Sequence, residues 1–200
     1  MGAAVESSRS VMARLASAAD ALPTAPRRSN GGELRLAVGD LVVYSAHGVG
    51  RVIARERTLV GGAERDCVLV DLAAGLRVTL PVEVATGRLR AVANEAEFEC
   101  VKETLAAEPA GRDGSWTRRI KENTAKLVSG GALELAELVR DGARYEAPAT
   151  GVSRLSAGER RLYLQARQLL AREICSARGV EQVEADAWIE AQLALPNRTC

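Results

Sequence analysis

Short apolar runs separated by tight turns dominate the chain between residues 34 and 93. Residues 41–44 form an apolar run that a turn follows, and residues 49–59 alternate apolar and polar positions up to Gly61 and Gly62. Alternation with a period of two and a Gly-Gly pair are typical of a β-hairpin. Further strands are expected at residues 67–70, 76–80 and 89–92. Short strands joined by glycine turns predict a small closed β-barrel of the SH3 or Tudor type.

Beyond residue 94 the apolar positions recur at the spacing of α-helices. Asn94 with Glu97, and Ser156 with Glu159, have the spacing of capping boxes, and Ser115 is a further N-cap candidate. Helices are expected after residue 94, over residues 116–129, 132–140 and 156–178, and around residues 183–193. The sequence therefore predicts an α+β fold, in which a small Tudor/SH3-like β-barrel is followed by a compact all-helical domain of five helices.

These patterns divide the chain into a flexible N-terminal extension (residues 1–33), a Tudor-like domain (residues 34–93) and a helical domain (residues 94–197). The extension is rich in Ser and Ala and ends in a stretch with Pro and Gly, which is typical of a linker. Inside the helical domain we expect a long connection over residues 141–154, because Gly142, Pro148 and Gly151 interrupt the helical pattern.

The composition is that of an ordinary soluble protein, with 47% apolar and 26% charged residues. We find neither an apolar run of the roughly 20 residues that a membrane span needs nor a signal-peptide core, so we expect a cytoplasmic protein. The four cysteines lie far apart, and the single histidine, His47, has no cysteine at ligand spacing. We therefore expect no metal and no cofactor, and cysteines that are reduced and mostly buried.

Charge is distributed unevenly, although the net charge is only +1. Residues 112–126 and 154–172 are rich in Arg and Lys, whereas residues 181–190 are acidic. The second expected helix has Arg118 and Arg119 in or beside its first turn, where the helix dipole favours carboxylates instead. Free N–H groups and guanidinium groups at such a position are suited to binding a phosphate group.

Trp116 lies beside this basic cluster, just after a glycine-rich loop. A tryptophan is more often a core residue, but an indole beside phosphate-binding arginines is able to wedge between the bases of DNA. Trp188, on an acidic amphipathic helix, is interpreted as a packing residue. The candidate DNA-binding residues are Trp116, Arg118, Arg119 and Lys121, with Arg160 and Arg167 as a second strip. For that strip, a merely solvated helix face is an equally good interpretation.

The predicted β-barrel has no arrangement of residues typical of catalysis, because His47 has no evident partner in its turn. Arg55, Arg57 and Arg77 are instead expected on an exposed edge strand. Such an edge accepts a strand from another protein, and the arginines would select an acidic partner.

Residues 38–44 read VGDLVVY, and residues 47–50 read HGVG. These motifs resemble the start of the polymerase-binding domain of the CarD/CdnL family, bacterial transcription regulators that bind RNA polymerase. The transcription-repair coupling factor carries a similar module, but WTRRIKEN at residues 116–123, without a helicase motor, is more specific for CarD/CdnL. The resemblance includes LPVE at residues 80–83, LVRD at 138–141 and LSAGER at 155–160, and it spans about residues 36–195.

The resemblance implies a function. In that family the Tudor-like domain binds the β subunit of RNA polymerase. The helical domain contacts the upstream edge of the melted promoter, where a tryptophan in the minor groove holds the open complex. By position, Trp116 would be the wedge and Arg57 the polymerase contact, and the DNA backbone contacts would be Arg118, Arg119 and Lys121. We expect a non-enzymatic monomer that associates with the nucleoid through RNA polymerase.

Other interpretations are open at this point. One alternative function is that of a protein-interaction adaptor, in which the helical domain would bind a protein rather than DNA. The affinity of that binding would not depend steeply on salt concentration. A cysteine-dependent enzyme is disfavoured, because only Cys67 has a basic neighbour, Arg65, in the sequence. Thr79 stands where some relatives have a basic residue, so either Arg77 makes the polymerase contact instead or the contact is weaker.

Overall fold

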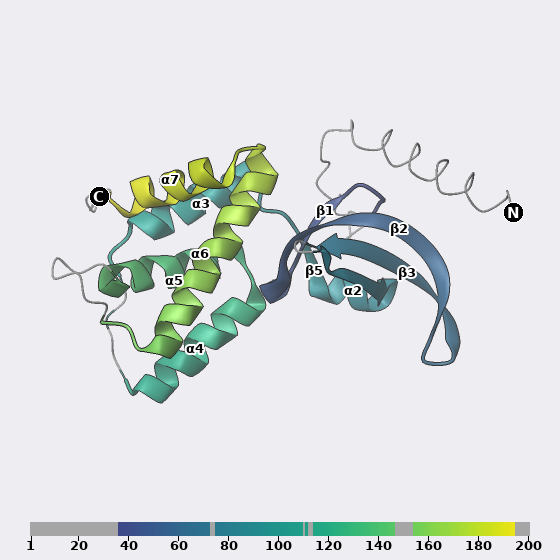
Figure 1. Ribbon diagram of the computed structural model, residues 1–200, viewed down its shortest axis with the longest axis horizontal. Coiled ribbons are helices and arrows are strands. Elements are labelled where there is room, and N and C mark those ends of the chain that lie inside the picture. Colours follow the sequence, from purple (N-terminus) through teal and green to yellow (C-terminus); the bar gives the residue numbers. More distant parts are fainter. Residues whose placement is uncertain (1–35, 73–74, 110, 112–113, 147–153, 195–200) are drawn as a thin grey trace, which may run out of the picture.

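The computed structural model describes residues 36–72, 75–109, 111, 114–146 and 154–194. An antiparallel sheet is followed along the chain by a set of helices (Figure 1), which confirms the predicted α+β fold with a Tudor-like part before a helical part. The extension predicted over residues 1–33 lies outside the described residues. None of the described helices is long and apolar enough to cross a membrane, and the described residues contain no cluster of His, Cys, Asp and Glu arranged to hold a metal.

In the described residues the sheet has five strands in the order β4-β3-β2-β1-β5, and all neighbours are antiparallel. The strands are β1 (Leu41–Tyr44), β2 (Gly48–Val60), β3 (Ala63–Leu72), β4 (Arg77–Pro81) and β5 (Leu89–Ala91). A short 3-10 helix, η1 (Ser45–His47), joins β1 to β2, and α2 (Val82–Arg88) joins β4 to β5. The strand β2 curves along its length, and the β2–β3 hairpin extends away from the helices (Figure 1).

One side of the outer half of β2 has no partner strand among the described residues. The strand β1 pairs with residues 48–51 of β2, whereas β3 pairs with residues 50–60 on the other side. Gly39 and Asp40 add backbone hydrogen bonds to Val52. Beyond Val52, the described part of the chain supplies no further backbone partner on that side, and we call residues 53–60, unpaired there among the described residues, the free edge of β2.

The helix α2 is not predicted by the sequence. Pro81 is expected to end a strand there, and Thr86 and Gly87 are weak helix formers. In the fold, α2 connects the two edge strands of the sheet, and its Ala85 is fully buried in the sheet core. Tertiary packing therefore overrides the weak helix propensity of this short segment.

The helical part contains five helices in the described residues, as predicted. They are α3 (Glu95–Ala106), α4 (Trp116–Ser129), α5 (Ala132–Glu146), α6 (Ala157–Arg178) and α7 (Gln182–Leu193). At the start of α3, Asn94 Oδ1 accepts a hydrogen bond from the Glu97 backbone N–H at 3.0 Å, and the Glu97 carboxylate accepts one from the Asn94 N–H at 2.8 Å. Ser156 and Glu159 form the same reciprocal pair at the start of α6. Both predicted capping boxes are confirmed.

The sheet and the helices have separate apolar cores. Val52 and Val68 lie in the sheet core, and Phe98 and Leu170 lie in the helical core. Trp188 packs against the helical core, with the Arg178 guanidinium 4.9 Å from its ring centroid, which confirms its predicted packing role.

The described cysteines are free thiols in different environments. Cys67 is buried as predicted, but Cys175 is only partly buried and Cys100 is exposed, so the expectation of mostly buried cysteines is wrong for these two. Burial and the nearby carboxylate of Asp186 raise the pKa of Cys175. A raised pKa lowers the thiolate fraction and so disfavours a nucleophilic role for this thiol.

The helix α5 continues through residues 141–146, where the sequence predicts a connection. Gly142 is buried there against the ring of Tyr163 on α6. A Cβ atom at position 142 would lie 2.7 Å from Tyr163 Cγ, which is closer than packed atoms come, so glycine allows the two helices to approach. The predicted connection over residues 141–154 is therefore wrong for residues 141–146, and residues 147–153 lie outside the described residues.

Gly142→Ala is expected to lower the free energy of unfolding by about 1–3 kcal/mol, because the added methyl group forces Tyr163 or the backbone to move. Urea denaturation followed by circular dichroism measures this change. Gly87→Ala is the matched control: this glycine also lies in a helix, but a Cβ there has no atom within 4 Å, so the same substitution should be neutral or stabilise by up to about 1 kcal/mol. A Gly142→Ala protein as stable as the wild type would contradict the packing argument.

Candidate functional site

Trp116 is the first residue of α4 and is held in an exposed position. Ser115 caps the helix, and its Oγ accepts a hydrogen bond from the Arg118 backbone N–H at 3.3 Å. The indole is 51% exposed, yet its Nε1–H donates to Ser156 Oγ at 2.9 Å. The ring is thus anchored at its polar edge while much of its surface faces solvent.

The N-termini of α4 and α6 meet at this indole. Ser156, which receives the indole hydrogen bond, is also the N-cap of α6, where its Oγ accepts from the Glu159 N–H and donates to the Glu159 carboxylate at 2.8 Å. Gly158 allows the side chain of Ile120 on α4 to come close to α6. Each helix N-terminus carries positive partial charge, and the carboxylate of Glu159 already lies at the N-terminus of α6.

Arg119 binds inward at this junction. Its Nε donates to the buried carboxylate of Glu159 at 3.2 Å, and its Nη1 donates to the Gly114 carbonyl at 2.9 Å. The Arg119 side chain is only 21% exposed. Arg119 therefore ties α4, α6 and the preceding loop together, and its predicted contact with the DNA backbone stays a prediction.

Arg118 and Lys121 lie on the outside of α4. The Arg118 Nε donates to the Glu122 carboxylate at 2.7 Å, and this hydrogen bond raises the pKa of Arg118. Both partners of this pair are well exposed, so a phosphate would compete with Glu122 for the guanidinium group at little energetic cost. Lys121 is exposed as well. Trp116, Arg118 and Lys121 are therefore all exposed on α4, and their joint contact with DNA stays a prediction.

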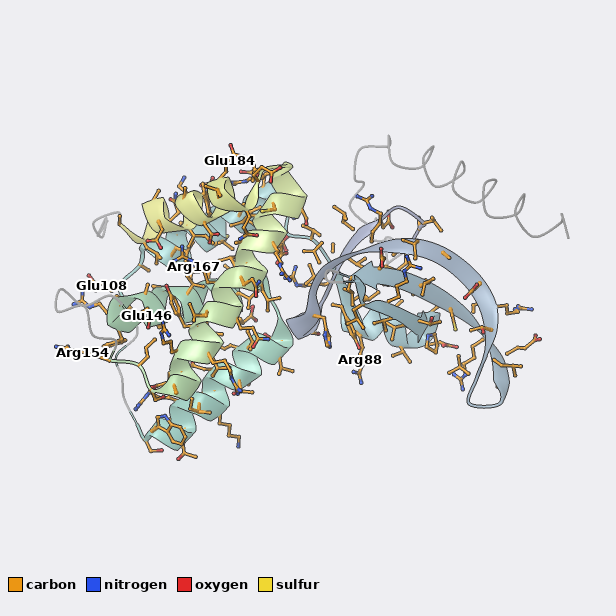
Figure 2. The ribbon with its side chains drawn as sticks, viewed as in Figure 1. Arg88, Glu108, Glu146, Arg154, Arg167 and Glu184 are labelled. Carbon is orange, nitrogen blue, oxygen red and sulfur yellow. The ribbon has the colours of Figure 1, made fainter. Side chains whose placement is uncertain are left out.

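Arg160 and Arg167, the predicted second strip, each pair with carboxylates of other helices. Arg160 donates to Glu146 at the end of α5 at 2.5 Å. Arg167 lies about 16 Å further along α6 than Ser156 at 1.5 Å per residue, and Figure 2 shows it between α6 and the layer of α3 and α7.

Carboxylates of α7 surround the Arg167 guanidinium. Arg167 pairs with Asp186 at 3.3 Å and with Glu190. Burial lowers the pKa of Arg167, but hydrogen bonds to Tyr163 and Glu190 outweigh that effect and raise its pKa overall. The geometry accounts for Arg167 as a link between α6 and α7, and a DNA contact by this residue stays a prediction.

The predicted polymerase-binding arginines divide between two faces of the sheet. Arg57 lies on the free part of β2 and pairs across the hairpin with Asp66 at 3.2 Å, with both side chains more than 60% exposed. Arg55 is opposite Val68 of β3 in the strand register, and Arg77 is opposite Asp71. Because side chains alternate along β3, Arg77 lies on the face opposite to Arg55 and Arg57. Arg55 and Arg57 share one face, and Arg77 is separate from them.

The junction between the sheet and the helices is a feature that the sequence prediction missed. Arg90 of β5 and Glu173 of α6 are joined there by two hydrogen bonds, although 83 residues separate them in the chain. A sequence signal for this pair exists: Glu173 interrupts the apolar stripe of α6, directly before Ile174. A charged residue inside an apolar stripe indicates a buried partner, but it does not identify that partner.

Comparison with known families agrees with the division into sheet and helices. Residues 36–93 match the family model described as CarD-like/TRCF RID domain. Residues 100–190 match the model described as CarD, C-terminal domain. The two matches follow one another along the chain and together cover most of it. The chain therefore belongs to the CarD/CdnL family of transcription factors that interact with RNA polymerase.

Proposed function

We propose that this protein binds the β subunit of RNA polymerase through its sheet and promoter DNA through the N-termini of α4 and α6, and that it thereby stabilises the open promoter complex. It would act in the cytoplasm as a monomer without a cofactor. The observation that carries the proposal is the exposed indole of Trp116, anchored by Ser156 at the meeting point of two helix N-termini.

The geometry around this indole supports the proposed binding to DNA. An apolar ring inserts readily between base pairs that are already unstacked, at the edge of the melted region. Lys121 and Arg118 would bind the flanking phosphates, Arg118 by exchanging Glu122 for a phosphate oxygen. Because the indole inserts only where bases are already unstacked, its binding would shift the equilibrium from the closed complex toward the open one without reading base sequence.

The polymerase half rests on the free edge of β2. An unpaired edge supplies backbone donors and acceptors for a strand of the partner. Arg57 lies on this edge, beside a shallow hollow that is also lined by Arg65, Asp66 and Glu83. An acidic side chain on the polymerase would replace Asp66 as the partner of the Arg57 guanidinium.

The function is tested by the lifetime of open complexes in a competitor challenge. Purified polymerase on a promoter should dissociate more slowly when the wild-type protein is present. DNA affinity of the protein should also fall steeply with rising salt, because each phosphate contact releases counterions. An unchanged open-complex lifetime at saturating protein would exclude the proposed function.

Arg57→Glu is expected to weaken binding to the polymerase β subunit about tenfold, equivalent to about 1.4 kcal/mol, because the reversed charge repels an acidic partner. A pull-down with purified β subunit measures the effect. Arg77→Glu is the comparison variant, since Arg77, the alternative polymerase contact, lies on the opposite face of the sheet and also pairs with an aspartate, Asp71. Loss of binding in the Arg77 variant with retention in the Arg57 variant would move the contact to the other face.

The second candidate function is that of a protein-interaction adaptor, whose helical part binds another protein rather than DNA. It is favoured by the ion pairing of the candidate DNA-binding arginines, since Arg118, Arg119, Arg160 and Arg167 all pair with carboxylates within the protein. Binding of the helical part to a protein would be retained at salt concentrations that abolish phosphate contacts. Absence of DNA affinity at low salt would favour the adaptor.

A further inference from the structure

Arg90 connects the sheet to two helices at once. Its Nη1 and Nη2 donate to the two carboxylate oxygens of Glu173 on α6, at 2.5 and 2.7 Å. Its Nε and Nη2 donate to the carbonyl of Gly130, which caps the C-terminus of α4, at 3.0 and 2.6 Å. One guanidinium group of β5 therefore holds the end of α4 and the side of α6 in a single planar arrangement, which fixes direction as well as distance.

Both carboxylate oxygens of Glu173 accept hydrogen bonds at this junction. It is only 1% exposed, and it also accepts the backbone N–H of Ala93 at 2.9 Å, in the segment that leads from β5 to α3. A buried carboxylate needs its partners in place because it has lost its water. Any rotation of the helices relative to the sheet would separate Glu173 from Arg90, so this pair makes such rotation unfavourable.

Two glycines with positive φ allow close contact at the same junction. A Cβ on Gly130 would lie 2.7 Å from the backbone of Ser45, and a Cβ on Gly48 would lie 3.1 Å from Leu169 of α6. The turn between β1 and β2 therefore lies directly on α4 and α6. The hydrogen bonds of Arg90 and this steric fit together would hold the sheet and the helices as one rigid unit.

The helices that Arg90 holds are the same two that hold Trp116. The helix α4 runs about 20 Å from Trp116 to Gly130, and α6 runs about 25 Å from Ser156 to Glu173. Each helix therefore has one end at the indole and another part at Arg90. Figure 1 shows both helices leading from the junction with the sheet to the opposite end of the helical part.

We infer that Arg90 and Glu173 are positioning residues, which set the direction and distance of the Trp116 indole relative to the polymerase-binding edge of β2. The expected effect on transcription rests on the proposed function. The fixed position of the sheet relative to the helices does not depend on that function. When polymerase holds the sheet, the indole is presented at one place on the promoter. Simultaneous binding at two sites gains affinity only when the spacing between them fits.

The test removes both charges together, so that no buried charge is left unpaired. Arg90→Met with Glu173→Gln keeps the volume and the acceptor for Ala93, but it removes the forked ion pair. The matched control is Arg178→Met with Glu95→Gln, a pair between α6 and α3 that does not reach the sheet. If the first double variant loses its circular dichroism signal, Arg90→Lys replaces it, because lysine retains the charge without the fork.

Distances between spin labels measure the rigidity directly. One label is placed on the exposed native Cys100 of the helical part and the other on Glu64→Cys near the hairpin, in a full-length chain with Cys175→Ala and Cys200→Ala; buried Cys67 stays unlabelled. The wild type and the control should give one narrow distance distribution, and the Arg90/Glu173 variant a clearly broader one. An equally narrow distribution in that variant would overturn the inference.

Function is measured on the unlabelled proteins. The Arg90/Glu173 variant should bind the β subunit and short DNA nearly as well as the wild type, but it should shorten open-complex lifetime about tenfold, because the two contacts are no longer aligned. A broadened distance distribution with a wild-type lifetime would overturn the positioning role. If the wild type itself has no effect on lifetime, the proposed function fails, while the label distances still decide whether the pair makes the protein rigid.

Discussion

Trp116→Ala is expected to shorten the lifetime of open promoter complexes about tenfold, because stacking between an aromatic ring and a base is worth about 1–3 kcal/mol. The indole is half exposed and lies outside the buried core of the helical part, so the fold should be retained. Circular dichroism checks the fold, and the decay of complexes after addition of a competitor measures the lifetime.

Two further variants make this experiment specific. Val128→Ala removes an apolar side chain of similar exposure, 58%, from the other end of the same helix, and it should leave the lifetime unchanged. Trp116→Phe retains a ring but loses the hydrogen bond to Ser156, so it should give an intermediate lifetime. A wild-type lifetime for Trp116→Ala would remove the indole from the mechanism.

Glu173→Ala is expected to lower the free energy of unfolding by about 3–5 kcal/mol, because removing one partner of a buried ion pair leaves the other charge uncompensated. The Arg90 side chain is only 28% exposed, so water replaces the lost carboxylate poorly. The Ala93 N–H loses its acceptor as well. Thermal denaturation should show a midpoint lower by on the order of 10 °C for a protein of this size.

The control for this prediction is an ion pair of the helical part that reaches solvent. Lys126 and Glu137 join α4 to α5 with side chains that are 33% and 39% exposed. Glu137→Ala should therefore change the free energy of unfolding by no more than about 1 kcal/mol. Equal losses in the two variants would mean that the buried position of Glu173 has no special importance.

Local signals in the sequence predicted most of the fold. The capping residues Asn94, Ser115 and Ser156 mark helix starts correctly, because a cap is made within four residues of the chain. The end of α5 was not predictable in the same way. Gly142 normally indicates a break, and the reason it lies within a helix is the ring of Tyr163, which arrives from a distant part of the chain.

The candidate site was predictable to the same extent. The position of Trp116 at a helix start follows from Ser115, and its exposure is compatible with the predicted role. Arg119 shares the sequence context of Arg118, yet it binds a buried carboxylate 40 residues away. Both arginines are close to Trp116 in the sequence, so the sequence alone does not show that Arg118 faces solvent while Arg119 holds two helices together. The difference arises because Arg119 has a distant partner, Glu159.

The free edge of β2 has a consequence for self-association. Two copies of the protein could pair the free edges of their β2 strands in antiparallel fashion. Directly opposite residues of paired strands lie on the same face of the sheet, so Arg55 and Arg57 of one copy would lie beside the Arg55 and Arg57 face of the other. With the pairing centred on Glu56, Arg55 would lie opposite Arg57, and the two Glu56 carboxylates would lie opposite each other. Like charges in directly opposed positions are destabilising. Paired in this register, the edge would repel its own copy, whereas a strand with acidic residues at alternating positions would fit it, and this difference would disfavour aggregation of the unbound protein.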